Sequence, residues 1–214
     1  MAGDSWSTVD RLNRPYNLGD SDFCFYYLRY TPYAGYEHSY ANQEVINYKI
    51  PIGGANGLTN KPSRAPHKQR AIENYASAII EFMSSKTLRN TGERLVDLGG
   101  RVGIVPAPTS MTPDDPEFDD RNVRTCDIVC DRTGFRFCRD VETMEFIGQS
   151  HSQGTRSPEL IRGSLGRVAH GCEFVFVVDD VLTTGAHFVA IKFLLQESGC
   201  SAQVFGIFYA KSEL

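Results

Sequence analysis

Apolar residues follow two different spacings along the chain. Between Ser63 and Ser85 they recur every three or four positions, which predicts an amphipathic helix. Ala186 to Ser198 has the same spacing and is followed by Gly199, a residue type that commonly ends helices. A third helix is expected from Arg121 to Arg132.

Shorter apolar or aromatic runs, bounded by glycine, proline or polar residues, predict strands. The predicted strands are Asp22–Thr31, Val45–Ile52, Leu95–Leu98, Val102–Pro106, Phe135–Arg139, Glu173–Val178 and Val204–Tyr209. Because strands alternate with helices from residue 64 onward, we expect an α/β fold with a parallel sheet.

Residues 1–60 contain eight of the ten tyrosines, and we interpret them as an aromatic-rich hood on an α/β core of residues 61–214. The first 20 residues are polar and are expected to be frayed or draped over the core. Residues 139–163 are polar and rich in glycine and serine. We predict that they form a long mobile loop.

The composition is that of a globular protein, with 41% hydrophobic and 22% charged residues. No apolar run is long enough to span a membrane, and Met1–Asp10 lacks the apolar centre of a secretory signal. We therefore expect a cytoplasmic protein with no membrane partner. The net charge of −4 gives no overall positive field for nucleic acid, although a local basic groove stays open.

The six cysteines have no C-x-x-C spacing and are expected to be buried thiols in a reducing compartment, with a metal site as the alternative. Two charged clusters are expected to face water. One is basic, with an anion as the alternative partner, and comprises Arg64, His67, Lys68 and Arg70. The other is the acidic stretch Met111–Asp120, with Asp114, Asp115, Glu117, Asp119 and Asp120.

The segment from Phe174 to Ala186 carries the clearest chemical signal. An apolar strand ends in Asp179 and Asp180, and Val181 and Leu182 lead to a Thr183-Thr184-Gly185 turn before a helix. In open parallel sheets, ligands bind at the carboxyl ends of strands. Amides and hydroxyls at a helix start can wrap a phosphate, and glycine lets the backbone approach the anion.

The two carboxylates of this segment repel a phosphate but can accept hydrogen bonds from sugar hydroxyls. The pattern therefore predicts a site for a ribose 5-phosphate unit. The alternative is an ordinary strand-to-helix turn in which Asp180 caps the helix.

This segment closely resembles the loop with which type I phosphoribosyltransferases bind 5-phosphoribosyl-1-pyrophosphate (PRPP). The resemblance implies an open, mostly parallel sheet flanked by helices, with a small N-terminal hood. It also implies that Asp179 and Asp180 hold the ribose hydroxyls, with direct Mg²⁺ contact left open. Val181, Leu182, Thr183, Thr184, Gly185 and Ala186 would then bind the 5-phosphate.

Residues 95–210 extend the resemblance, most closely toward the ComF-type branch of competence proteins. Ile104–Pro108 looks like that branch's strand and Pro-x-Pro turn, so Pro108, Thr109 and Ser110 are expected in the pyrophosphate loop. Arg121-Asn122 resembles a remnant of its Arg-Gly-Phe-Asn stretch. Weaker echoes of its mobile loop are Thr143, Gln149, Arg156 and Gly163-Ser164-Leu165.

The missing zinc ribbon and His187 depart from the family pattern, and Thr183, which orotate-type and ComF-type members share in similar form, bears on the acceptor. The zinc ribbon usual in ComF-type proteins is absent from the sequence. Thr183 stands where 6-oxopurine-salvage enzymes carry an aspartate, which disfavours hypoxanthine or guanine as the acceptor. His187 stands where a second threonine or serine is common, and either reaches the phosphate or covers the helix end.

The resemblance implies transfer of ribose 5-phosphate from PRPP to a nitrogen nucleophile, such as a nucleobase, with release of pyrophosphate. Mg²⁺ would be the cofactor, and Arg156 or Arg139 would close over the pyrophosphate. Tyrosines of the hood would face the acceptor. PRPP or a nucleoside monophosphate is the expected partner, and a homodimer is left open.

Two alternatives to the transferase remain at this point. One is a protein that senses PRPP or a nucleotide without catalysis. The other is a nucleotide- or nucleic-acid-directed protein of defence or DNA uptake.

Overall fold

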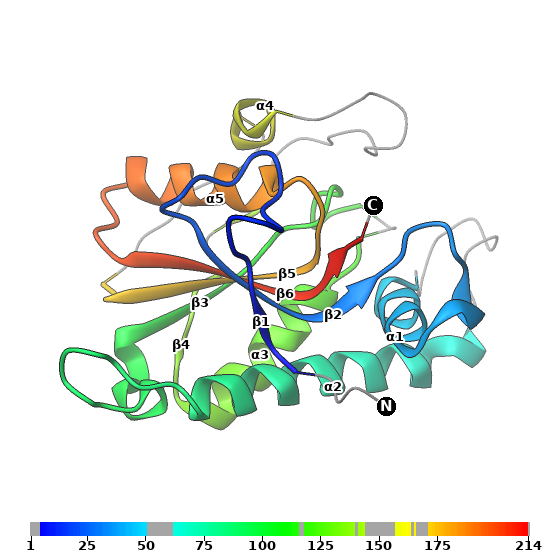
Figure 1. Ribbon diagram of the computed structural model, residues 1–214, viewed down its shortest axis with the longest axis horizontal. Helices are drawn as coiled ribbons and strands as arrows, with labels where there is room; N and C mark the ends of the chain where they lie inside the picture. Colours follow the sequence, from blue (N-terminus) through cyan, green and yellow to red (C-terminus); the bar gives the residue numbers. More distant parts are fainter. Residues whose placement is uncertain are drawn as a thin grey trace.

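The computed structural model describes residues 5–50, 62–115, 118–139, 141–143, 157–163, 165 and 171–213. Within these ranges the chain forms an α/β structure, in which helices cover both faces of one six-stranded sheet (Figure 1). The sheet is mixed but mostly parallel, as the alternation of strands and helices predicted.

The strand order in the sheet is β1-β2-β6-β5-β3-β4, and only the β1–β2 pair is antiparallel. The strands are β1 (Ser7–Thr8), β2 (Phe23–Tyr30), β3 (Val102–Pro106), β4 (Arg136–Phe137), β5 (Phe174–Leu182) and β6 (Gln203–Ser212). Because β2, β3, β5 and β6 run in the same direction, their carboxyl ends meet at one edge of the sheet.

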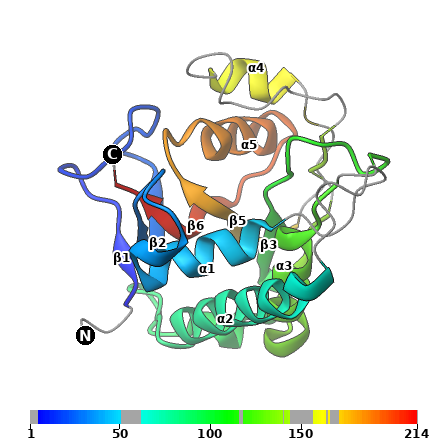
Figure 2. The ribbon, with the colours of Figure 1, turned by 90° about the vertical axis from the view of Figure 1, so that its right-hand side faces the viewer.

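One face of the sheet carries α1, α2 and α3, and the other carries α4 and α5 (Figures 1 and 2). The helices are α1 (Tyr40–Lys49), α2 (Ala65–Ser84), α3 (Arg121–Thr133), α4 (Pro158–Gly163) and α5 (Ala186–Glu197). Short 3₁₀ helices are Tyr36–His38, Pro62–Arg64 and Leu95–Arg101. In Figure 2, α1 lies across the front of the sheet between α2 and α5.

Strand β5 separates two hydrophobic cores, one on each face of the sheet. Its Val175 and Val177 pack with Phe188 on the α5 side, whereas Phe176 and Val178 pack with residues of the α2 and α3 side. All four β5 residues are buried. A strand covered on both faces needs the continuous apolar run seen in the sequence.

Three fully buried tyrosines, Tyr48, Tyr75 and Tyr209, join α1, α2 and β6. Tyr75 stacks on Tyr209 with ring centroids 4.4 Å apart, and Tyr48 meets both rings edge-on at 5.6 and 5.3 Å. Such aromatic pairs add about 0.5–1.5 kcal/mol each beyond the apolar area that they bury. This tyrosine cluster fixes α1 against the sheet.

Most of the predicted elements are confirmed, with shifts of a few residues at their ends. The strands Asp22–Thr31, Val102–Pro106, Phe135–Arg139, Glu173–Val178 and Val204–Tyr209 correspond to β2, β3, β4, β5 and β6. The three predicted helices correspond to α2, α3 and α5. All six cysteines are described and form no disulfide, and five of them are buried.

The strand predicted over Val45–Ile52 is wrong, because residues 40–49 form α1. Ser39 caps this helix by accepting a hydrogen bond from the Asn42 amide at 3.1 Å. Val45 and Tyr48, three positions apart, bury one helical face in the α2-side core. That packing outweighs the strand preference of a β-branched and aromatic sequence.

The strand predicted over Leu95–Leu98 is also wrong, because these residues lie in the 3₁₀ helix Leu95–Arg101. Only Leu95 and Leu98 of this helix are buried. Their spacing of three matches the three residues per turn of a 3₁₀ helix, which brings both side chains to one side.

The N-terminal segment is draped over the core and contributes to the main sheet. Trp6 donates its indole N–H to the Ala78 carbonyl of α2 at 3.0 Å, and β2 pairs along its length with β6. Most of the predicted loop 139–163 lies outside the described residues, but Pro158–Gly163 forms α4. Among the described helices, none combines the length and apolar character needed to cross a membrane.

Gly206 leaves room for the contact between β2, β6 and α5. A Cβ at this position would lie 2.7 Å from Cε2 of Phe208 and 2.8 Å from Sγ of Cys24. We expect Gly206→Ala to lower the unfolding free energy by about 1–3 kcal/mol through overpacking, measured by urea denaturation. Gly100→Ala is the matched control, since no atom lies within 4 Å of its added Cβ. Equal stability of the two variants would contradict this account.

Candidate functional site

The carboxyl ends of the parallel strands open onto a cavity of about 810 Å³. Its floor is the turn from β5 into α5, and Pro108–Ser110 after β3 form one wall. The start of α3 contributes Arg121 and Asn122, while β2, α1 and the end of β6 form the opposite wall. The cavity therefore collects residues that lie far apart in the sequence.

The cavity brings together almost all of the predicted site residues. The cavity-lining members of that set are Asp179, Asp180, Val181, Leu182, Thr183, Thr184, Gly185, Ala186, Pro108, Thr109 and Ser110. Thr143 and His187 line it as well. Arg156 and Gln149 lie outside the described residues.

Gly185 sits at the start of α5 in the left-handed conformation, with φ of 80°, and no side chain caps the helix there. The first amides of a helix have no partner within the helix, and its dipole is positive at this end. Thr184 contributes its hydroxyl, which accepts a bond from the Ala186 amide at 3.4 Å. The turn thus offers donors and a favourable field to an anion.

The close approach that Gly185 permits is with Leu18, whereas the sequence analysis assigned it to the bound anion. A Cβ on Gly185 would lie 2.7 Å from Cδ2 and Cγ of Leu18. Next to it, the Asn17 amide donates to the Thr184 carbonyl at 2.9 Å. Part of the N-terminal segment therefore supports the turn from behind.

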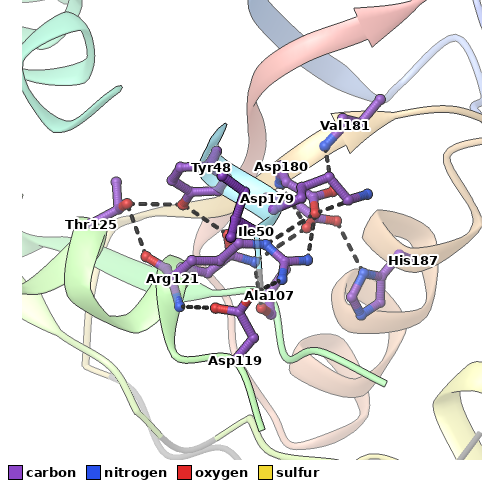
Figure 3. A network of polar contacts seen from close by, with 12 residues as sticks. Tyr48, Ile50, Ala107, Asp119, Arg121, Thr125, Asp179, Asp180, Val181 and His187 are labelled. Carbon is purple, nitrogen blue, oxygen red and sulfur yellow. Dashed lines mark hydrogen bonds and ion pairs between the residues drawn. The ribbon is translucent and has the colours of Figure 1, made fainter. Parts of the chain in front are cut away.

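Asp179 is 8% exposed and is held mainly by uncharged donors. Its Oδ1 accepts from the Asp180 amide at 2.8 Å and from Nδ2 of Asn122 at 3.3 Å. Its Oδ2 lies 3.0 Å from Nδ1 of His187, a contact drawn in Figure 3. The imidazole at the second position of α5 therefore touches the carboxylate that the sequence assigns to ribose.

Asp180 is equally buried but is paired with cations. Arg121 donates Nε and Nη2 to its Oδ2 at 3.2 and 2.6 Å, and Nζ of Lys49 lies 3.3 Å from the same oxygen. The Val181 amide donates to its Oδ1 at 2.5 Å. The two neighbouring carboxylates thus have different electrostatic environments.

The ion pairs continue behind Asp180 into the protein (Figure 3). Arg121 donates Nη1 to Oδ2 of Asp119 at 2.6 Å. The buried Lys68 donates to Oδ1 of Asp119 at 2.7 Å and to the Ile50 carbonyl at 2.8 Å. We call Lys49, Lys68, Asp119, Arg121 and Asp180 the charged cluster.

The charged cluster corrects two expectations from the sequence. Lys68 was expected in water but is 3% exposed, and Asp119 of the acidic stretch is its partner. Lys49 was missed because its segment was taken for a strand. A signal for Lys68 was present, since it lies four positions before the buried Ile72, on the apolar face of the helix.

The charged cluster shifts the pKa values of its members. Burial alone raises the pKa of Asp180, but the charges of Lys49 and Arg121 outweigh it and hold that pKa well below its ordinary value. Burial alone lowers the pKa of Arg121, but Asp180 and Asp119 more than compensate. Both groups therefore stay charged at neutral pH.

Two hydroxyls of the cavity wall have buried oxygens that lack a hydrogen-bond partner among the described residues. They are Oγ1 of Thr109, after β3, and Oγ of Ser212, the last residue of β6. An unpaired buried hydroxyl costs free energy. Both oxygens are buried, so in this structure they are not open to a ligand in the cavity.

Tyr30 and Tyr33 are the hood tyrosines that line the cavity. Tyr33 is 86% exposed and has a positive φ of 63°. In contrast, Tyr26 and Tyr48 are buried in the two cores. The tyrosine-rich segment therefore supplies both core packing and part of the cavity wall.

No protein-family model matches this chain, and no curated protein matches its sequence. Among the described residues, no group of three or more histidine, cysteine or carboxylate side chains is arranged to hold a metal ion. What the cavity binds is therefore inferred from its own residues.

The low pKa of Asp180 predicts how stability depends on pH. The folded-state pKa is depressed, so the Asp180 contribution is complete above the unfolded value of about 3.9 and is lost as pH falls below it. We expect Asp180→Asn to flatten the loss of unfolding free energy below about pH 4, measured by urea denaturation over a pH series. Asp131→Asn, an exposed carboxylate on α3, should keep the wild-type slope. If the unfolding free energy of Asp180→Asn falls with pH as steeply as that of the wild type, the charged cluster does not stabilise the ionised form of Asp180.

Proposed function

We propose that this protein is a phosphoribosyltransferase of the type I kind, which binds PRPP in the cavity and transfers ribose 5-phosphate to a nitrogen nucleophile. The observation that carries the proposal is one juxtaposition. Two buried carboxylates and the Thr183–Gly185 turn at the start of α5 share a cavity with the loop after β3. Each of the three chemical parts of PRPP then meets groups suited to it.

The 5-phosphate would fit the turn at the start of α5, where the first amides lack partners within the helix and the helix dipole favours an anion. The ribose hydroxyls fit Asp179 and Asp180, which are acceptors beside that turn. The pyrophosphate would then lie toward Pro108–Ser110, the loop after β3 that lines the same cavity.

Mg²⁺ is expected to arrive on the pyrophosphate of PRPP, since hard divalent cations prefer oxygen ligands. Asp179 is the carboxylate that would be available to hold it, because Asp180 is already paired with Arg121 and Lys49. When bound, Mg²⁺ neutralises charge that develops on the leaving pyrophosphate.

The proposed reaction breaks the bond between C1 of the ribose and the pyrophosphate oxygen, and the electron pair leaves with pyrophosphate. Positive charge builds on the ribose ring as this bond breaks. The acceptor nitrogen then forms the new bond to C1, and its proton passes to the released pyrophosphate. Asp179 would hold the ring and stabilise the developing charge. Positioning and fixed charges of this kind can supply much of an enzymatic rate gain.

The acceptor would fit against Tyr30, Pro32, Tyr33 and Ile46, which line the cavity. An aromatic ring stacked on tyrosine gains about 1–3 kcal/mol per base. A planar nitrogen heterocycle is therefore the acceptor class that this wall suits.

A non-catalytic PRPP or nucleotide sensor is the second proposal. Arg121 and Lys49 already pair with Asp180, so a ribose must compete with these cations for the carboxylate. This competition favours the sensor over the transferase. Incubation with PRPP, Mg²⁺ and a panel of nucleobases separates the two functions. Pyrophosphate release that depends on one acceptor supports the transferase, whereas PRPP binding without release supports the sensor.

Asp179 is expected to contribute directly to PRPP affinity. Hydrogen bonds to a charged group contribute about 1.5–3 kcal/mol, which corresponds to a loss of roughly 10- to 150-fold in affinity for Asp179→Asn. Isothermal titration calorimetry with PRPP and Mg²⁺ measures this loss. Asp131→Asn, which removes an exposed carboxylate of α3, is the control and should bind as the wild type does. If Asp179→Asn binds PRPP as tightly as the wild type does, Asp179 does not bind the ribose.

A further inference from the structure

Three consecutive residues at the end of α1 each contact the network that holds the two site carboxylates. Tyr48 contacts Asn122, the partner of Asp179. Lys49 pairs with Asp180 directly. The Ile50 carbonyl accepts from Lys68, whose other partner, Asp119, holds Arg121. The same helix turns Ile46 toward the cavity.

Asn122 is the most constrained member of this network. Its Nδ2 donates to the Ala107 carbonyl at 2.8 Å and to Oδ1 of Asp179 at 3.3 Å. Both of these partners only accept hydrogen bonds, so the amide nitrogen must face them. Its Oδ1 is then left to accept from the Tyr48 hydroxyl at 3.0 Å. Asn122 is 2% exposed, so water has little access to replace any of these bonds.

Tyr48 is fully buried and its ring is held by Tyr75 and Tyr209. Burial raises the pKa of Tyr48 well above its ordinary value, so the hydroxyl keeps its proton and stays a donor. The hydroxyl also lies 2.8 Å from Oγ1 of Thr125 (Figure 3). Thr125 can donate its proton to Tyr48 or to the Arg121 carbonyl at 2.9 Å, and when it donates to Tyr48 the phenolic proton goes to Asn122. A rigid donor on α1 therefore fixes the amide that contacts both the end of β3 and the end of β5.

We propose that Tyr48 is a positioning residue, which acts through Asn122 to orient the Asp179 carboxylate and so couples α1 to the ribose site. The expected effect of Tyr48 on PRPP binding rests on the proposed function. Ile46 lies on the same helix as Tyr48. A ligand that contacts Ile46 and a ribose held by Asp179 would therefore act on the same connected set of contacts. Each ligand would then change the affinity for the other by the same factor.

The test compares two variants that each remove one buried hydroxyl from the same tyrosine cluster. Tyr48→Phe keeps the ring but loses the bond to Asn122. Tyr209→Phe is the matched control, because its hydroxyl bonds Glu44 and not a cavity residue. Glu44 keeps a bond from Nδ2 of Asn74 in that control. Thermal unfolding of both variants checks that they fold.

The first readout needs no ligand. Because Nδ1 of His187 lies 3.0 Å from Asp179, the ¹⁵N chemical shifts of its ring report the carboxylate position. The signals are assigned by their loss in His187→Gln. We expect Tyr48→Phe to move these shifts and Tyr209→Phe to leave them at wild-type values. Wild-type shifts in Tyr48→Phe would overturn the proposal, whatever the protein binds.

The second readout is PRPP affinity with Mg²⁺ by calorimetry. Loss of one neutral hydrogen bond of about 1 kcal/mol should weaken binding by about fivefold in Tyr48→Phe, with no change in Tyr209→Phe. In an Asp179→Asn background, Tyr48→Phe should cost no further affinity, since the two residues act as a unit. Effects that multiply in the double variant would contradict the coupling. Failure of the wild type to bind PRPP would refute the proposed function, while the His187 shifts still decide the role of Tyr48.

Discussion

The Arg121 guanidinium lies mostly buried between two carboxylates, Asp119 and Asp180, and lines the cavity beside them. Removing a charge from water costs several kcal/mol, so a buried ion is stable only where its partners are fully in place. The partners come from the segment before α3 and from β5. When both carboxylates pair with Arg121, they fix the position of these two segments relative to each other. Lys68 extends the same constraint to α2.

This constraint gives the two adjacent carboxylates unequal properties. Asp180 is neutralised by guanidinium and ammonium groups and is part of the framework. Asp179 contacts an amide, a backbone N–H and an imidazole, and its neighbours leave it the more available acceptor. Tertiary contacts thus give two acids that are adjacent in sequence different surroundings, one paired with cations and the other with mostly uncharged donors.

Helix α1 links this framework to the rest of the cavity wall. Its buried side carries Tyr48 into the tyrosine cluster, and its end carries Lys49 onto Asp180. Tyr30 and Tyr33 reach the cavity from β2 and the segment that follows it. The N-terminal 50 residues therefore support the sheet, support the turn through Leu18, and form one side of the cavity.

The sequence alone was enough for most of the alternation of strands and helices and for the Thr-Thr-Gly turn between β5 and α5. These features depend on local patterns: a continuous apolar run for a strand covered on both faces, and threonines with glycine where a helix begins. Residues 45–52 were misread because a β-branched and aromatic run fits either element, and only packing against Tyr75 and Tyr209 selects the helix.

The partners of Asp180 were equally hidden. Lys49 and Lys68 lie far from Asp119 and Arg121 in the sequence, and a charged residue in sequence is by default a solvated one. The tertiary fold brings these groups together and buries Lys68 fully and Asp119 and Arg121 in large part, and charges taken out of water must pair.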